Sequence, residues 1–255
     1  MIALISDIHG NTAALNQVLD DAKQQGADRF FCLGDVVGYG PEPRECLLTI
    51  MDLCEVCLMG NHEQAAMFYA ADFNPKARQA IEWTKNTLNS PDRPKEENFR
   101  LWNYLDKMPE RYEEGELLLV HGSPRDPIRE YMLPSDAIDD VKMKGCFAKM
   151  GGAAICFVGH SHVPGVYEEG GGFLSPQSLG GTYERRKTGE GPTRIIVNIG
   201  SVGQPRDGDP RASYVLFDGD KVHFRRVAYD VEATVQKIRE TSLPEYLADR
   251  LIVGR

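Results

Sequence analysis

The sequence contains no apolar run of the roughly 18 residues that a helix needs to cross a membrane. Its first ten residues, MIALISDIHG, carry no basic segment, and their apolar run stops at Asp7, which argues against a secretory signal peptide. We therefore expect a cytoplasmic protein that does not use a membrane as a partner.

Positive charge is also scarce. The 29 lysines and arginines are outnumbered by 38 aspartates and glutamates, which gives a formal net charge of −9. Nucleic-acid backbones and anionic membranes are held mainly by clustered Lys and Arg, so this balance argues against both as partners. Binding of a phosphate group must then be local, through metal ions or a few arginines.

The six cysteines show no pattern that links them. They lie mostly inside apolar runs, where a free thiol behaves as a small hydrophobe. Cys54 and Cys57 form a C-x-x-C without a second pair or a flanking Gly or Pro turn, which disfavours a zinc or redox role. We expect reduced thiols.

The remaining composition, 42% hydrophobic and 26% charged, is typical of a packed globular chain, and we predict one domain spanning residues 1–255. Apolar runs at Ile2 to Ser6 and Arg29 to Leu33 enclose a segment with helical spacing, which predicts a β-α-β opening. Residues 64–109 carry two helical patterns separated by SPDRP, which predicts a helical insertion. After Pro164 the chain becomes β-rich, and we assign this part to a second sheet.

Metal-type ligands follow the buried strands of the first two thirds of the chain. They form the clusters SDIHG, GD, GNHE, HG and GHSH, which contain Asp7, His9, Asp35, Asn61, His62, Glu63, His121, His160 and His162. The carboxyl ends of strands in an α/β sheet open onto the binding crevice, so all five clusters are expected to converge. The sixth histidine, His223, lies in a predicted hairpin and is assigned to the surface.

Each cluster alone has an ordinary structural explanation. A lone His after a strand, such as His121, is usually a hydrogen-bonded structural residue, and a lone Gly-Asp is usually a turn. Together, however, Asp7 and Asp35 would face each other among imidazoles, where unpaired carboxylates are costly to bury. Divalent cations relieve that cost, and oxygen and imidazole ligands without cysteine suit manganese, iron, zinc or nickel. Two such ions roughly 3.5–4 Å apart would activate a shared water and clamp a phosphoryl group.

The order D-x-H, GD, GNH[DE], H-G, GH-x-H resembles the pattern of the calcineurin-like metallophosphoesterase superfamily, and the matching motifs run from Asp7 to His162. The segments VGYGPEP, VHGSPRDP and GSVGQPRDGDPRASY resemble its bacterial and archaeal branch of stand-alone phosphoesterases and phosphodiesterases. The resemblance implies an α/β fold, a four-layered α-β-β-α sandwich of two mixed sheets flanked by helices, with the site at the sheet ends.

The resemblance also implies roles for individual residues. Two metal ions would be held by seven ligands: Asp7, His9 and His162 on the first, Asn61, His121 and His160 on the second, and Asp35 bridging both. His62 would be the general acid for the leaving alkoxide, oriented by Glu63. The implied reaction is in-line attack on phosphorus by a metal-bound hydroxide.

Residues outside the motifs have weaker assignments. Arg125 and Arg206 are candidate phosphate ligands, because guanidinium groups bind phosphate bidentately, and a solvated loop arginine is the ordinary alternative. Tyr39 is expected to pack a turn, and Asn11 to cap the helix that follows it.

The predicted activity is hydrolysis of a phosphodiester or a small phosphomonoester. A phosphoprotein or dinucleoside polyphosphate phosphatase is the alternative, because relatives of both kinds use the same seven ligands. A non-catalytic protein-binding scaffold is disfavoured by the presence of His62 and of every ligand. The helical insertion would wall the crevice and favour small substrates. The sequence leaves the physiological substrate, the metal pair and the oligomeric state open.

Overall fold

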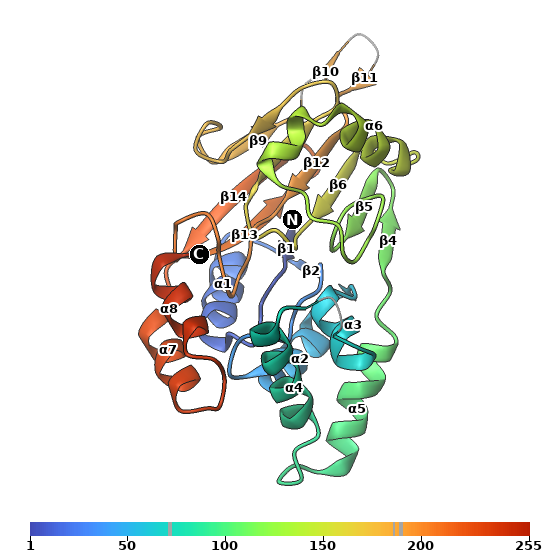
Figure 1. Cartoon of the computed structure of the whole chain (residues 1–255). Coiled ribbons are helices and arrows are strands. Elements are labelled where there is room, and N and C mark those ends of the chain that lie inside the picture. The colour runs from blue at the N-terminus through green and yellow to red at the C-terminus, as the bar shows by residue number, and fades with distance from the viewer. Residues whose placement is uncertain (71–72, 186, 189–190) are drawn as a thin grey trace.

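The computed structural model describes residues 1–70, 73–185, 187–188 and 191–255, and two six-stranded sheets form its centre (Figure 1). The strands of the first sheet, in order across it, are β3 (Val56–Cys57), β2 (Arg29–Cys32), β1 (Ile2–Ile5), β13 (Ala212–Phe217), β14 (Lys221–Val227) and β9 (Thr182–Glu184). Those of the second are β4 (Arg111–Glu114), β5 (Leu117–Val120), β6 (Ile155–Val158), β12 (Ile195–Asn198), β7 (Gly165–Glu168) and β8 (Phe173–Leu174). A separate pair consists of β10 (Lys187–Thr188) and β11 (Gly191–Pro192).

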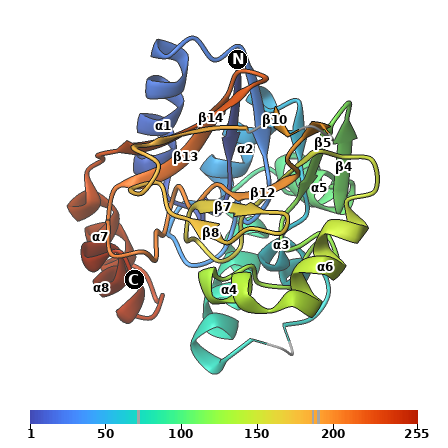
Figure 2. The same ribbon diagram turned by 90° about the horizontal axis from the view of Figure 1, so that it is seen from above.

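Helices flank the two sheets. They are α1 (Thr12–Gln24), α2 (Pro43–Leu53), α3 (Asn61–Met67), α4 (Pro75–Leu88), α5 (Lys95–Asp106), the 3-10 helix η1 (Pro134–Ile138), α6 (Asp140–Lys149), α7 (Val231–Arg239) and α8 (Tyr246–Val253). Figure 2 shows α1 and α6 on opposite outer faces of the layered sheets. Both sheets are mixed, since each joins parallel and antiparallel neighbours. The predicted α-β-β-α sandwich is confirmed. No helix in the described part of the chain is long and apolar enough to span a membrane.

The alternation of side chains along each strand builds three apolar layers. On β1, Ala3 and Ile5 face the core under α1, whereas Leu4 faces the core between the two sheets. On β6, Phe157 joins the layer between the sheets, and Cys156 joins the layer under α6. All five side chains are fully buried. Strands covered on both faces therefore read as continuous apolar runs, as the sequence predicted.

The helix after β1 has the cap that the sequence predicted. The Asn11 side chain accepts a hydrogen bond from the Ala14 N–H at 3.1 Å. Its amide also donates to the Gly203 carbonyl at 3.0 Å, and its oxygen accepts from the Thr234 hydroxyl at 3.0 Å. One side chain thus both caps α1 and ties it to the loop before β13 and to α7.

The assignment of the β-rich part after Pro164 to a second sheet is wrong. Its strands divide between both sheets: β7, β8 and β12 extend the second, and β9, β13 and β14 complete the first. The reason is that β1 and β6 each have one edge that no strand before Pro164 pairs with. Strand β13 pairs with this edge of β1, and β12 pairs with this edge of β6. An apolar run shows that a strand is buried but not which edge it joins.

A buried arginine joins the predicted helical insertion to α2. Arg44, 3% exposed, donates to the Leu88 carbonyl at 2.8 Å, where α4 ends, and to the Asn98 side chain on α5 at 2.7 Å. It also contacts the Thr87 carbonyl at 3.3 Å and the Glu97 carboxylate. The last carbonyls of a helix have no partner within the helix, so this guanidinium satisfies the end of α4 and fixes α5 beside it.

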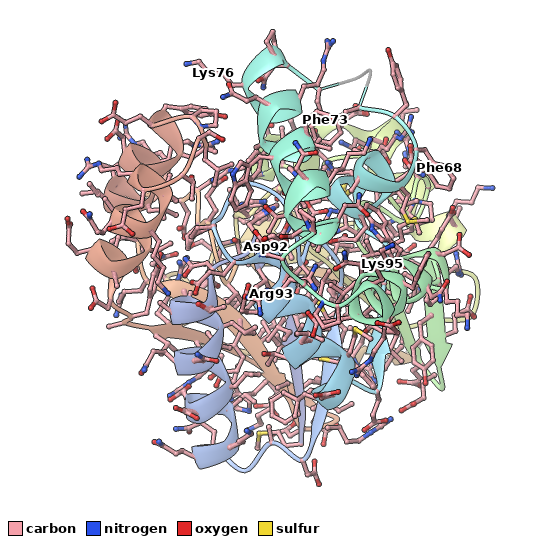
Figure 3. The ribbon with its side chains drawn as sticks, turned by 90° about the horizontal axis from the view of Figure 1, so that it is seen from below. Phe68, Phe73, Lys76, Asp92, Arg93 and Lys95 are labelled. Carbon is pink, nitrogen blue, oxygen red and sulfur yellow. The ribbon has the colours of Figure 1, made fainter. Side chains whose placement is uncertain are left out.

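We expect Arg44→Met to lower the free energy of unfolding by about 2–4 kcal/mol, because buried acceptors then lose their donor. Urea unfolding followed by circular dichroism measures the loss. Arg93→Met is the matched control: Arg93 lies in the connection between α4 and α5 (Figure 3), and its side chain is 52% exposed and meets Glu45 at 3.5 Å. An equal loss in both variants would contradict a specific role for the buried guanidinium.

Candidate metal centre

The loops that follow β1, β2, β5 and β6 and the start of α3 bring the five ligand clusters together. These elements belong to both sheets, so the site lies where the carboxyl ends of the two sheets meet. The carboxylates and imidazoles predicted as ligands are all buried, with exposures of 4% or less: Asp7, His9, Asp35, His121, His160 and His162. Asn61 is half-buried at the edge of this group.

The ligand atoms form two adjoining groups. In the first, His162 Nε2 lies 3.0 Å from Asp7 Oδ1 and 3.2 Å from His9 Nε2. In the second, His121 Nε2 lies 3.3 Å from Asp35 Oδ2 and 3.1 Å from Asn61 Oδ1.

Asp35 connects the two groups. Its Oδ2 also lies 3.8 Å from His9 Nε2, and it shares a compact group of possible ligands with His121 and His160. The sequence-based assignment of Asp35 as the bridging ligand is compatible with this central position.

The far side of each imidazole is held by a backbone carbonyl. His9, His121 and His162 place Nδ1 at 3.1, 2.9 and 2.5 Å from the carbonyl oxygens of Val37, Leu33 and Gln204, respectively. A carbonyl only accepts, so Nδ1 carries a proton in each ring. Burial lowers the pKa values of His9 and His162, so their Nε2 atoms present lone pairs.

His160 has the reverse arrangement. Its Nε2 donates to the Arg129 carbonyl at 3.1 Å, which leaves the lone pair on Nδ1. Hydrogen bonds of this kind commonly orient histidines that bind metals.

This donor set fits a metal ion. With their protons on Nδ1, the Nε2 lone pairs of His9 and His162 face each other and face Asp7 Oδ1, an oxygen without a hydrogen-bond partner among the described residues. Buried lone pairs that converge without a proton between them repel one another. A cation among them removes the repulsion, and an oxygen and imidazole set suits a divalent transition metal.

The backbone around the ligands adopts an uncommon conformation. Within the described ranges, positive φ at non-glycine residues occurs at Asp7 (53°), His9 (49°), Asp35 (52°), Tyr39 (59°), His160 (62°) and His162 (59°). The left-handed region costs an ordinary residue roughly 1–2 kcal/mol, and such strain gathers at functional sites. Five of the six residues are predicted ligands, so the strain coincides with the site.

Two glycines allow the carboxylates to approach the backbone. A Cβ at Gly159 would lie 2.5 Å from Asp7 Oδ2, and one at Gly60 would lie 2.2 Å from Asp35 Oδ1. The space they leave allows the His160 N–H to donate to Asp7 at 3.0 Å, and the His62 N–H to donate to Asp35 at 2.9 Å. These bonds orient both carboxylates toward the imidazoles.

Burial and charge act in opposite directions on the carboxylates. Burial raises the pKa of Asp35, but the neighbouring His121 and His62 outweigh it and hold that pKa well below its usual value. Asp7 behaves in the same way, with His162 as the main opposing partner, and its pKa is also lowered. Burial lowers the pKa of His62 to about 4. Burial lowers the pKa of His121, but the neighbouring Asp35 outweighs it and raises that pKa to about 9. At neutral pH the ion-free site therefore presents two carboxylates, a protonated His121 and a neutral His62.

The predicted orienting role of Glu63 is not what the structure shows. Its carboxylate accepts three backbone N–H groups, those of Asp35 at 2.8 Å, Gly60 at 2.9 Å and Val37 at 3.0 Å. The His62 Nδ1 has no hydrogen-bond partner in the described part of the chain. The Glu63 carboxylate is occupied by these backbone groups, so Glu63 shapes the loop that carries Asp35.

The two candidate phosphate arginines have different surroundings. Arg125 pairs with Glu130, with its Nε 3.0 Å from that carboxylate, and its side chain lies against Gly145 of α6. An arginine held this way is engaged in structure, which corrects its assignment to the substrate. Arg206 does lie by the site, because its guanidinium is 5.8 Å from the centre of the Tyr39 ring. Burial lowers the pKa of His162, and the positive charge of Arg206 lowers it further.

Sequence reasoning missed the aromatic residues around the histidines. The Tyr39 ring lies 4.3 Å from that of His62, edge-on, and the Phe73 ring approaches the same imidazole at 5.1 Å. Tyr131 stacks on His160 at 3.8 Å. Tyr39 was assigned only to a turn, and neither Phe73 nor Tyr131 lies in a recognisable motif, so only the folded chain places them here.

The family model for calcineurin-like phosphoesterases matches residues 1–164. The chain belongs to the calcineurin-like phosphoesterase family. An uncharacterized protein of Methanocaldococcus jannaschii is 39% identical over 264 residues, which cover 100% of this chain and 98% of that protein. The family predicted from the order of the motifs is confirmed.

Solved structures show the same fold. The crystal structure of a metallophosphoesterase from Sphaerobacter thermophilus is 38% identical and has a TM-score of 0.80, covering 100% of this chain and 98% of that one. A hypothetical protein from Pyrococcus horikoshii OT3 is 20% identical with a TM-score of 0.74, covering 100% and 99%, and shows the fold alone. The buried His and Asp groups of this phosphoesterase can bind metal.

We expect His162→Asn to reduce the metal content of the purified phosphoesterase, because it removes a ligand atom from the first group. Plasma mass spectrometry measures metal per chain. His223→Asn is the control, since His223 lies in β14, 3.2 Å from Asp218 and outside the ligand groups. Equal metal content in His162→Asn and His223→Asn would contradict the assignment.

For the wild type, manganese at about 100 times its Kd should add about 2.7 kcal/mol to the unfolding free energy of the metal-stripped protein.

Proposed function

We propose that this chain hydrolyses phosphodiesters or small phosphomonoesters with the help of two metal ions. The observation that carries the proposal is the convergence of buried imidazoles and carboxylates on both sides of Asp35. Membership of the calcineurin-like phosphoesterase family supports the same class of reaction. Manganese, iron, zinc and nickel are the metals that suit such ligands.

Seven side chains would hold the two ions: Asp7, His9 and His162 for one, Asn61, His121 and His160 for the other, and Asp35 between them. When bound, these ions supply positive charge for the phosphoryl oxygens and lower the pKa of a water molecule. The chain itself fixes the ligands before any ion arrives, because backbone carbonyls set the imidazole tautomers and backbone N–H groups orient the carboxylates. Such preorganisation favours stabilisation of charge during reaction.

His62 is the proposed general acid. Its backbone N–H donates to Asp35, and its ring has edge contacts with the rings of Tyr39 and Phe73, which help to fix its position. Burial keeps this imidazole neutral, with a pKa of about 4, whereas transfer of a proton to a leaving oxygen requires the imidazolium. The negative charge of a bound phosphoester favours the protonated form and so favours proton transfer to that oxygen.

The cavity beside the metal centre supports a small substrate. It measures about 200 Å³, below the roughly 300–1,000 Å³ typical of sites for drug-sized ligands. Gln64, Tyr69, Phe73 and Ala77 line one side of it, and all four come from the predicted helical insertion. A wall of this kind suits an ester of limited size better than a folded phosphoprotein.

We expect metal-stripped protein to hydrolyse bis-p-nitrophenyl phosphate or p-nitrophenyl phosphate when supplied with manganese, iron, nickel or zinc. His62→Ala should lower kcat by about 10²–10⁴-fold, the usual contribution of a general acid, while metal content stays at the wild-type level. Release of p-nitrophenolate measures the rate, and His223→Ala serves as the control.

Two results would contradict the proposal. Absence of hydrolysis with every metal, in protein that binds two ions, would favour a protein-binding scaffold. Hydrolysis of a phosphopeptide as fast as that of the small esters would contradict the preference for small substrates.

A further inference from the structure

The lining of the cavity beside the metal centre includes several aromatic residues. Four of its residues carry aromatic rings, Tyr39, Tyr69, Phe73 and Tyr131. Asn61 and His160 belong both to this lining and to the second group of metal ligands, so the cavity opens directly onto that group. A phosphoester whose phosphate lies at the metals would place its organic part among these rings.

Two of these rings are left accessible by the fold. Tyr69 is 79% exposed and Tyr131 is 45% exposed. Tyr131 is nevertheless fixed, because it stacks on His160 with ring centroids 3.8 Å apart and an interplanar angle of 22°. An accessible ring held rigidly at the edge of a cavity is suited to stacking on a planar ligand.

Polar groups lie at the same edge. The Arg129 Nε donates to the Gln64 side-chain oxygen at 2.9 Å, and both residues line the cavity together with Asn74. Amide and guanidinium groups around an apolar slot can recognise heteroatoms at the rim of a ring. The volume of about 200 Å³ suits one small ring system.

We propose that this cavity binds a planar aromatic group that is joined to the phosphate directly or through a sugar, so that the preferred esters are aryl or nucleoside phosphoesters and not simple alkyl ones. The inference rests on the proposed function, because it assumes that the phosphate is held at the metal centre. Tyr69 and Tyr131 stack on the ring, and Gln64 and Asn74 lie at its edge.

A binding experiment tests the inference without hydrolysis. Calorimetry on manganese-loaded protein compares phenylphosphonate with methylphosphonate, two anions that share the phosphonate group. We expect phenylphosphonate to bind about tenfold more tightly, the effect of about 1.4 kcal/mol from one stacked ring. Tyr69→Ala should lose most of this preference and leave the affinity for methylphosphonate unchanged.

Phe68→Ala is the matched control. Phe68 adjoins Tyr69 and is 66% exposed, but it is not part of the cavity lining. Figure 3 shows it near the end of α3, with Phe73 on the other side of the same connection, before α4. This variant should keep the full preference. Equal affinities for the two phosphonates, or an equal loss in Phe68→Ala and Tyr69→Ala, would overturn the inference.

A kinetic arm distinguishes the two sources of the ring. The p-nitrophenyl esters of methyl phosphate, phenyl phosphate and thymidine 5′-phosphate share one leaving group and differ in the other substituent. A lower KM for both phenyl and thymidine esters supports recognition of any aromatic ring, and a lower KM for thymidine alone supports nucleosides. Absence of hydrolysis of all three, with the preference for phenylphosphonate retained, would count against the proposed function and leave the aromatic site supported.

Discussion

The convergence of lone pairs between Asp7, His9 and His162 is the constraint on which the rest of the site depends. Their ligand atoms lie 3.0 to 3.9 Å apart, and backbone carbonyls fix the imidazole protons on the far side of the rings. Repulsion between these lone pairs favours a conformation in which the three side chains move apart. The ligand loops resist this by hydrogen bonding to neighbouring loops, as the Asp7 N–H does to the Gly34 carbonyl at 3.0 Å.

The two sheets carry different parts of the metal centre, so the packing between them controls its dimensions. Asp7 and Asp35 follow strands of the first sheet, and His121, His160 and His162 follow strands of the second. Phe157 and Phe217 meet edge-on between the sheets, with ring centroids 5.5 Å apart. Close-packed interiors transmit small displacements, so a change of volume in this layer would alter the spacing of ligands that lie beyond the strand ends.

Much of the fold and of the ligand set could be predicted because both depend on local pattern. Buried strands followed by Asp, His and Gly identify the sheet ends, and the order of the motifs identifies the family. The predictions that failed concern contacts between parts of the chain that are distant in sequence or side chains whose reach the pattern does not show. The length of Glu63 decides whether it reaches His62 or the backbone of Val37, and the neighbour Glu130 decides where Arg125 points. Strand pairing after Pro164 depends on which sheet edges remain open.

The aromatic residues show why substrate choice and chemistry are coupled in this chain. Tyr39 and Phe73 both line the cavity and contact the ring of His62, and Tyr131 both lines the cavity and stacks on His160. A substitution that reshapes the cavity through any of these three would therefore also move a histidine of the metal centre. Tyr69 differs, because it lines the cavity and is largely exposed. Substrate preference can therefore diverge most freely at Tyr69, where a side chain can change without altering the positions of the ligands.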